Sequence, residues 1–171
     1  MQENLPNNQE TFQIHDAETY GDTISSVIKN EVSIAITNQD EDELMQLAGG
    51  ILVLKEIKNQ PKNSFFVTCT RDNKIIGISC IAITDEDEKV IDTFIFVSKK
   101  FRKLGIATQL ISQTHINLIE MGIMEYNVHV SDESEKLYIS IRSSIGTNNV
   151  VSIEETEDRG YQKTLLVKLK K

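Results

Sequence analysis

A short basic turn holds the residues whose types and spacing point most directly to chemistry. Residues 99–103 read Lys-Lys-Phe-Arg-Lys, so four positive charges fall within five positions of a chain whose formal net charge is −8. Gly105 and Ala107 follow, and apolar residues then recur at helical spacing up to Met121. The N-terminus of a helix offers unpaired backbone N–H groups and the positive end of a dipole, and both attract anions. The turn therefore predicts a seat for an anion; the alternative interpretation is a solvated strand-to-helix connection.

The elements on either side of this turn decide where it would lie. Residues 90–97 (VIDTFIFV) are the most apolar strand candidate and are expected at the centre of a sheet. The helix predicted after Gly105 ends at Gly122, where a C-terminal cap belongs, and residues 125–130 (EYNVHV) read as the next strand. This order predicts a βαβ crossover that places the turn at the C-terminal edge of the first strand.

The whole chain predicts a mixed central sheet flanked by helices, of the α/β (α+β) class. We expect residues 1–30 to be an N-terminal extension, partly disordered or with a short helix over 18–30, and residues 31–171 to be the domain. Within that domain the pattern predicts a strand over 31–37 and a helix over 38–60 that Gly49 and Gly50 could break or bend. It then predicts strands over 64–70 and 74–84 joined by a turn at 71–73, a helix over 131–141, and a final hairpin of 149–155 with 161–170.

The turn differs from two common phosphate-binding patterns. It holds no Gly-Lys-Ser/Thr and is therefore no P-loop, and it lacks the first glycine of the dinucleotide fingerprint. Binding is instead expected from helix N–H groups, from close approach of the backbone at Gly105, and from the Lys and Arg side chains.

The segment from Val97 to Ile111 (VSKKFRKLGIATQLI) resembles the acetyl-coenzyme-A-binding motif of the GNAT N-acetyltransferase superfamily. Its core is a strand that ends at Val97, then Arg102, Gly105 and Ala107 at the entrance to a helix. The order of predicted elements also agrees with that family from about residue 31 to the C-terminus. The resemblance implies the GNAT-like acyl-CoA N-acyltransferase fold, with acetyl-CoA as co-substrate and no metal.

The same resemblance implies which residues contact acetyl-CoA. The backbone of the strand end would hold the pantetheine arm, and the turn would wrap the pyrophosphate. The acetyl thioester would lie where strands 90–97 and 125–130 splay apart, and a neutral amine would attack its carbonyl directly in a ternary complex, with a backbone N–H stabilising the oxyanion. The implied cofactor-binding residues are Ile95, Phe96, Val97, Arg102, Lys103, Leu104, Gly105, Ile106, Ala107 and Thr108.

Tyr138 is the expected catalytic residue, because the family often has a tyrosine at this place that protonates the leaving thiolate. The alternative is a packing role. The family's asparagine at the start of that helix is replaced by Ser131 or Asp132, and the Gly-Phe that usually follows the tyrosine is missing.

A general base is not assigned by the sequence. Glu125, Asp92 and His129 lie on or beside the two splayed strands, but strand alternation forbids all three from facing one side. Bulk water is the remaining acceptor for the proton of the amine.

The predicted function is transfer of an acetyl group to a primary amine of a small molecule or peptide; the alternative is a noncatalytic CoA-binding regulatory module of the same fold. Acidic runs at 40–43 (DEDE) and 154–158 (EETED) favour a cationic acceptor, although solvated charge is the alternative for each. The sequence predicts neither the acceptor's identity nor the oligomeric state.

Composition excludes several other classes. The acidic balance argues against nucleic acid, and the lack of an apolar run of about 18 residues argues against a membrane span. His15, His115 and His129 are scattered, which predicts no metal site. Cys69 and Cys80 lie in apolar runs, as expected of buried free thiols, and the N-terminus has no signal-peptide pattern, so a cytoplasmic protein is expected.

Overall fold

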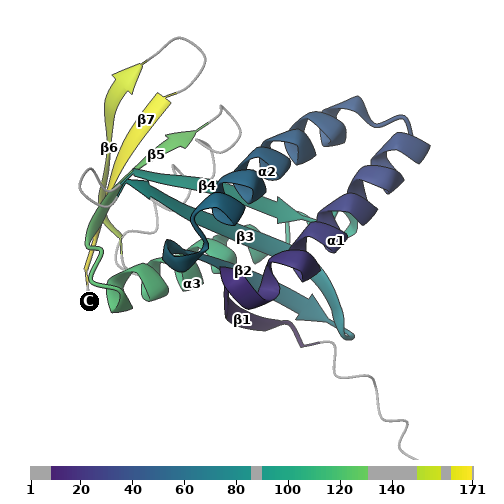
Figure 1. Ribbon diagram of the computed structural model, residues 1–171, viewed down its shortest axis with the longest axis horizontal. Coiled ribbons are helices and arrows are strands. Elements are labelled where there is room, and N and C mark those ends of the chain that lie inside the picture. Colours follow the sequence, from purple (N-terminus) through teal and green to yellow (C-terminus); the bar gives the residue numbers. More distant parts are fainter. Residues whose placement is uncertain (1–8, 86–89, 131–149, 159–162, 171) are drawn as a thin grey trace, which may run out of the picture.

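The computed structural model describes residues 9–85, 90–130, 150–158 and 163–170. These residues form one seven-stranded sheet with the order β1-β2-β3-β4-β5-β7-β6 (Figure 1). Only β4 and β5 pair in parallel among the described strands. The elements are β1 (Thr11–Asp16), α1 (Ala17–Thr37), α2 (Glu41–Asn59), the 3-10 helix η1 (Pro61–Asn63), β2 (Ser64–Arg71), β3 (Lys74–Asp85), β4 (Val90–Val97), the 3-10 helix η2 (Lys99–Phe101), α3 (Ile106–Glu120), β5 (Glu125–Val130), β6 (Val150–Asp158) and β7 (Lys163–Leu169). The predicted mixed sheet with one βαβ crossover, β4-α3-β5, is confirmed.

The strand predicted over residues 31–37 is wrong, because these residues form the last turns of α1. Their β-branched composition favours a strand locally, but burial decides otherwise. Ile24, Ile28 and Ala35 are spaced at four and seven residues, and all three are buried on one helical face. The expected domain boundary at residue 31 therefore falls inside a helix.

The N-terminal segment also contributes a strand that the sequence pattern did not reveal. β1 pairs antiparallel with β2, from Thr11 opposite Thr70 to Asp16 opposite Phe65. Asp16 then caps α1, because its carboxylate accepts a hydrogen bond from the Thr19 backbone N–H at 2.9 Å. The short helix expected over 18–30 is confirmed as part of this longer one.

Helices α1 and α2 cover one face of the strands β2 to β4 (Figure 1). α2 runs through Gly49 and Gly50 without a break. Gly50 is buried, and a Cβ at this position would lie 2.5 Å from Cε1 of Phe94 on β4. The missing side chain therefore lets the helix approach the sheet closely.

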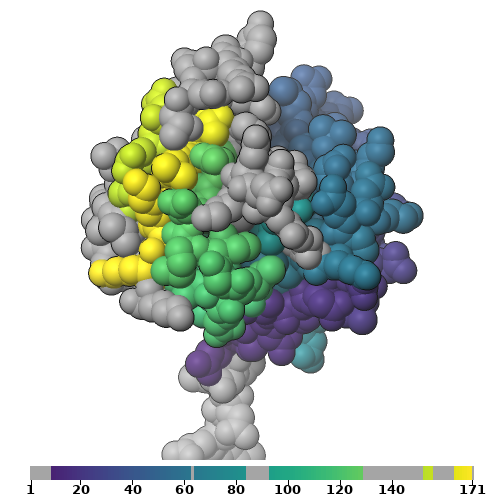
Figure 2. All heavy atoms as spheres, turned by 60° about the vertical axis from the view of Figure 1, so that its left-hand side comes forward, coloured from purple at the N-terminus to yellow at the C-terminus, as the bar shows by residue number. Residues whose placement is uncertain are grey.

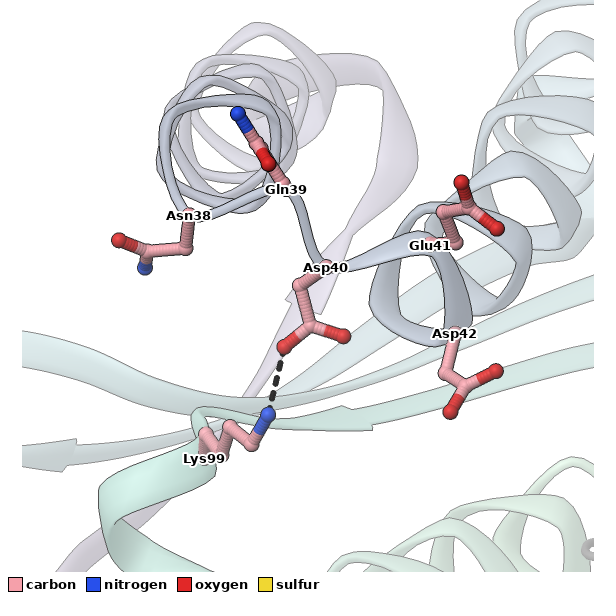
Figure 3. A pocket seen from close by; sticks show the side chains of 6 residues that line it. All are labelled: Asn38, Gln39, Asp40, Glu41, Asp42 and Lys99. Carbon is pink, nitrogen blue, oxygen red and sulfur yellow. Dashed lines mark hydrogen bonds and ion pairs between the residues drawn. The ribbon is translucent and has the colours of Figure 1, made fainter.

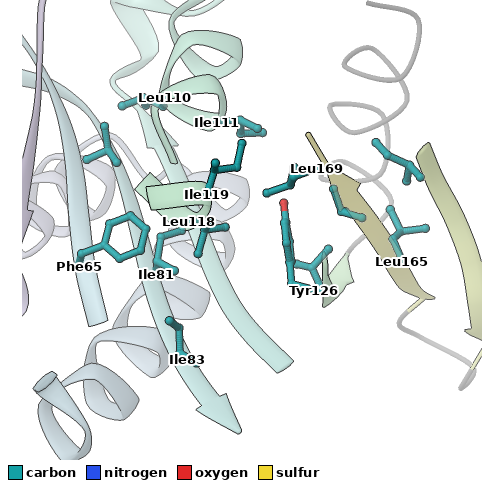
Figure 4. Close-up of a cluster of buried hydrophobic side chains, with 14 of the residues drawn as sticks. Phe65, Ile81, Ile83, Leu110, Ile111, Leu118, Ile119, Tyr126, Leu165 and Leu169 are labelled. Atoms are coloured by element: carbon teal, nitrogen blue, oxygen red, sulfur yellow. The ribbon is translucent and has the colours of Figure 1, made fainter. Parts of the chain in front are cut away.

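Helix α3 covers the opposite face and packs on a second apolar cluster (Figure 4). This cluster extends from β2 and β3 beneath the helix to β5 and β7, so that it joins both halves of the sheet. Its most enclosed members include Ile81, Leu110, Leu118 and Tyr126. The crossover helix is thus held by side chains from strands on both sides of the parallel pair.

The two cysteines are buried free thiols, as the sequence predicts. Cys69 on β2 belongs to the cluster beneath α3, whereas Cys80 on β3 belongs to the cluster beneath α1 and α2. The sheet separates them, so a disulfide between them is excluded in this fold.

The predicted turns are confirmed where the structure describes them. Asp72 and Asn73 connect β2 and β3 with φ values of 51° and 59°, as a tight hairpin requires. Gly122 follows α3 with φ of 84° and closes the helix as expected. β6 and β7 form the predicted final hairpin, while the helix expected over 131–141 lies outside the described residues.

Candidate functional site

Within the part of the chain that the structure describes, the C-terminal half of the central strand β4 has no strand paired along its edge towards β5. On its other edge β3 pairs with it as far as Val97, opposite Gly77. Towards β5 the pairing comprises only Val90 with Asn127 and Ile91 with Val128, and β5 then diverges from β4 (Figure 1). A strand edge without a neighbour presents backbone N–H and C=O groups that can pair with another extended chain.

The turn predicted from the basic residues begins directly after this open edge. Lys103 and Gly105 both have positive φ, at 64° and 79°, and Gly105 is the N-cap of α3. No side chain caps the helix, and the first intrahelical bond runs from the Gln109 N–H to the Gly105 carbonyl at 3.1 Å. The amides of residues 106–108 therefore have no partner within the helix.

The backbone at this helix end is accessible. A Cβ built on Gly105 would meet no atom within 4 Å, so the backbone there is open to a ligand. Lys100 and Lys103 are exposed, and neither pairs with a carboxylate among the residues that the structure describes. Open amides, a helix dipole and two unpaired cations are the chemistry that a pyrophosphate requires.

Arg102 does not extend towards the helix end. Its Nε donates to the Val97 carbonyl at 2.8 Å, and its Nη2 forms an ion pair with Oε1 of Glu43 on α2. The guanidinium also lies over the ring of Phe96, 5.9 Å from its centroid. Arg102 thus ties the end of β4 to the start of the turn and to the first turn of α2.

Lys99 makes a second link to the same part of the chain. Its Nζ lies 2.5 Å from Oδ2 of Asp40, the N-cap of α2, and this bond lowers the pKa of Asp40 and raises the pKa of Lys99 (Figure 3). The pair borders a hollow of about 430 Å³. Its lining residues are Asn38, Gln39, Asp40, Glu41, Asp42 and Lys99.

The structure brings the predicted cofactor-binding residues together along one path. Ile95, Phe96 and Val97 lie on the open half of β4, and residues 102–108 follow within the turn and the first turn of α3. The side chain of Ile106 is buried, at 3% exposure, so only its backbone can face a ligand. Leu104 is 59% exposed beside the helix end. Tyr138 lies outside the described residues.

The three candidates for the general base lie on different sides of the residues that pair β4 with β5. Glu125 begins β5 and precedes the residues that pair with β4. Asp92 and His129 come directly after the paired residues, where the two strands diverge. The backbone therefore places Asp92 and His129, and not Glu125, at the opening.

Sequence reasoning missed the carboxylates that hold the basic turn. Asp40 and Glu43 were expected only as part of an acidic rim for an acceptor, yet they pair with Lys99 and Arg102. Equal and opposite charge clusters at 40–43 and 99–103 were a signal for this pairing, but no local pattern indicates that segments so far apart in sequence meet.

Residues 36–141 match a family model described as an acetyltransferase (GNAT) domain. That match spans more than half of the chain. The chain belongs to the GNAT family of acetyltransferases. Membership of this family supports acyl transfer as the class of reaction. No curated protein matches the sequence.

Solved structures of GNAT proteins share the fold at low sequence identity. They include the PaiA N-acetyltransferase of Thermoplasma acidophilum in complex with coenzyme A (10% identity, TM-score 0.58, 92% of this chain and 99% of that one). Ard1 of Thermoplasma volcanium (16%, 0.58, 94% and 99%) and a GNAT-family acetyltransferase of Staphylococcus aureus Mu50 (14%, 0.56, 94% and 100%) are also similar. The GNAT fold predicted from the sequence is thereby confirmed.

None of the helices in the described residues is both long and apolar enough to span a bilayer. No group of three or more His, Cys, Asp or Glu side chains within the described part of the chain is arranged to hold a metal ion.

Proposed function

We propose that this GNAT-family protein transfers the acetyl group of acetyl-CoA to a primary amine of a small molecule or peptide. One observation carries the proposal: the edge of β4 that no described strand pairs with is followed, after the turn of residues 98–105, by the N-terminus of α3, which has no side-chain cap. The edge suits an extended pantetheine arm, and the helix end suits the pyrophosphate that follows it. A GNAT protein of the same fold was solved with coenzyme A, which supports this ligand.

The backbone carries the binding in this proposal. Amides of residues 103–108 would surround the pyrophosphate, and Lys100 and Lys103 would add charge from the turn. Lys99 and Arg102 have carboxylate partners already, so they contribute by shaping the turn.

The reaction itself needs few protein groups. The amine nitrogen bonds to the acetyl carbon, the carbon–sulfur bond breaks, and the departing thiolate takes up a proton. The neutral amine loses one proton, and Asp92, His129 or water are the candidates to accept it. We assign protonation of the thiolate to Tyr138. Figure 2 shows the surface of residues 105–130 (green) between β6–β7 (yellow) and α1–α2 (purple to blue), so the acceptor would approach a site bordered by both.

The carboxylates near the start of α2 and on β6 bear on the charge of the acceptor. Asp40 and Glu43 are neutralised by Lys99 and Arg102, and Glu154 lies 3.5 Å from the ammonium of Lys168. Glu41 and Asp42 stay exposed at the start of α2. A cationic acceptor remains our proposal, supported by these two carboxylates and by the net charge of −8.

The test combines binding and turnover. Gly105→Glu places bulk and negative charge at the proposed phosphate seat, whereas Gly49→Glu makes the same change on the exposed side of α2, where a Cβ meets nothing within 4 Å. Calorimetry should show that Gly105→Glu weakens CoA binding by about 100-fold or more, as for a loss of at least about 2.7 kcal/mol, with little change for Gly49→Glu. Equal affinity in all three proteins would contradict the proposed site.

Turnover is measured as thiol release from acetyl-CoA with cationic, neutral and carboxylate-bearing amines at two ionic strengths. A cationic preference that weakens with salt supports the proposed acceptor, and a preference for anionic amines contradicts it. CoA binding without thiol release across the panel would instead identify the noncatalytic binding module.

A further inference from the structure

The segment 98–102 is joined to the α1–α2 helix pair by three polar contacts. The hydroxyl of Ser98 donates to Oε1 of Glu31 at 2.9 Å, Lys99 pairs with Asp40, and Arg102 pairs with Glu43. Every one of these contacts joins a residue directly after β4 to a carboxylate from α1 or from the start of α2. The two helices therefore hold the turn from the side opposite α3.

The three contacts differ in how strongly they constrain the turn. The side chain of Lys99 is 70% exposed, so its pair with Asp40 is screened by water and contributes little. Glu43 is only 7% exposed and the side chain of Arg102 is 31% exposed, so this pair is better shielded from water than the pair of Lys99 with Asp40. A buried carboxylate is costly without its partner, so this pair resists rearrangement far more than the exposed one.

Arg102 is held on three sides by this arrangement. Nη2 forms an ion pair with Glu43, Nε donates to the Val97 carbonyl, and the guanidinium lies over the Phe96 ring. Lys103, the next residue, has φ of 64°, a conformation that a non-glycine residue adopts only when its surroundings enforce it. The contacts of Arg102 hold the residue that directly precedes this conformation.

We infer that Glu43 is a positioning residue for the pyrophosphate turn, and that it acts through Arg102 to fix the backbone amides which receive the anion. The inference rests on the proposed CoA site. It means that α2 contributes indirectly to binding of the acyl donor. It also means that Arg102 stabilises the turn and does not bind the phosphate.

Charge alone and the positioning role predict opposite changes in CoA affinity when Glu43 is neutralised. A carboxylate near an anion site repels the anion, so its neutralisation in Glu43→Gln should tighten CoA binding if charge alone mattered. If Glu43 positions the turn, the same substitution should weaken binding, since the amides lose their fixed arrangement. The matched control is Asp42→Asn, which removes one charge from the same helical turn at an exposed residue that has no ion pair among the described residues.

The experiment is calorimetric titration of each folded protein with CoA. We expect Glu43→Gln to raise the Kd about tenfold, which corresponds to about 1.4 kcal/mol, while Asp42→Asn leaves the Kd unchanged or slightly lower. Arg102→Gln should raise the Kd by a similar factor. The double variant should bind CoA no more weakly than either single variant, because both substitutions remove the same contact between Glu43 and Arg102. In turnover, Glu43→Gln should raise KM for acetyl-CoA and leave kcat nearly unchanged.

Two results would overturn the inference while leaving the CoA site intact: Glu43→Gln binding CoA as tightly as wild type or tighter, or fully additive effects in the double variant. If every variant, Gly105→Glu included, binds CoA as tightly as wild type, the proposed CoA site and the inference are both overturned. If Glu43→Gln does not fold, the inference is tested on the wild-type protein through the NMR resonance of the Arg102 Nε–H. This resonance is assigned by its absence from the spectrum of Arg102→Lys. Its protection from exchange should persist when CoA binds, and its loss would show that Arg102 moves to the ligand.

Discussion

His115 on α3 and Tyr126 on β5 share a hydrogen bond inside the core, with 2.7 Å between the imidazole Nε2 and the phenol oxygen. Both residues are almost completely buried, at 0% and 1% exposure. Tyr126→Phe removes the hydroxyl and leaves His115 without this partner, so the free energy of unfolding should fall by about 1–3 kcal/mol. Urea denaturation measures it, with the partly exposed Tyr20→Phe as the control. A loss no larger than that of the control would contradict the prediction.

Adjacent glycines on α2 should respond oppositely to alanine. A Cβ on Gly50 would lie 2.5–2.9 Å from three ring atoms of Phe94, whereas a Cβ on Gly49 meets nothing within 4 Å. Gly49→Ala should therefore stabilise the protein by up to about 1 kcal/mol through helix propensity, and Gly50→Ala should destabilise it by about 1–3 kcal/mol through overpacking. Thermal and urea unfolding test both. Phe94→Leu should reduce the cost of Gly50→Ala, and the absence of any rescue would exclude the ring contact as its cause.

Acid should weaken the attachment of β1 and α1 through His15. Its Nε2 lies 2.9 Å from Oγ1 of Thr68, its ring stacks on Tyr20 at 3.7 Å, and burial lowers the pKa of His15 below the usual 6.5 despite the opposing charge of Asp16. The folded state thus disfavours the protonated ring. The stabilisation is complete above about pH 6.5 and is lost as the pH falls through that value towards the lower folded-state pKa.

The measurement for His15 is urea unfolding at pH 7.5 and pH 5.5. His15→Phe keeps an aromatic ring beside Tyr20 and removes the titration, so its stability should change less between the two pH values than that of wild type. The same pH dependence in both proteins would mean that other groups cause it.

Neither thiol should react in the native protein. Burial raises the pKa of Cys69 to about 11 and raises the pKa of Cys80 further, so neither is a thiolate near neutral pH. An aromatic disulfide reagent should therefore detect no thiol in native buffer and two in denaturant. One fast-reacting thiol in the native state would contradict the burial of that residue.

Tyr138→Phe tests the proposed acid for the departing thiolate. The substitution keeps the ring and removes the proton donor, so kcat should fall roughly 100-fold with little change in the Kd for CoA. A second readout is the pH profile, whose alkaline limb should change if the phenol donates the proton. Equal kcat in both proteins would make Tyr138 a packing residue.

Local patterns predicted the crossover well because each of its parts has a strong signal. The apolar run 90–97, the helical period after Gly105 and the cap at Gly122 all describe interactions between near neighbours in sequence. The family motif then located the turn, which the structure places at the open edge of β4.

The errors have the opposite origin, because they depend on contacts between distant segments. Residues 31–37 have strand-like composition, yet the packing of α1 on α2 and the sheet makes them helical. β1 is defined only by its pairing with β2, and the partners of Lys99 and Arg102 are 59 residues away. Such contacts leave little trace in a single sequence.

The parallel junction between β4 and β5 has a thermal consequence. Two register pairs join the halves of the sheet at this seam, while the apolar cluster beneath α3 crosses it with many side chains. Cohesion across the seam thus comes mainly from the hydrophobic effect and only slightly from backbone hydrogen bonds. Because hydrophobic stabilisation weakens on cooling, we expect this boundary to loosen before the antiparallel parts of the sheet when the protein is chilled, and it adjoins the edge of β4 where CoA is proposed to bind.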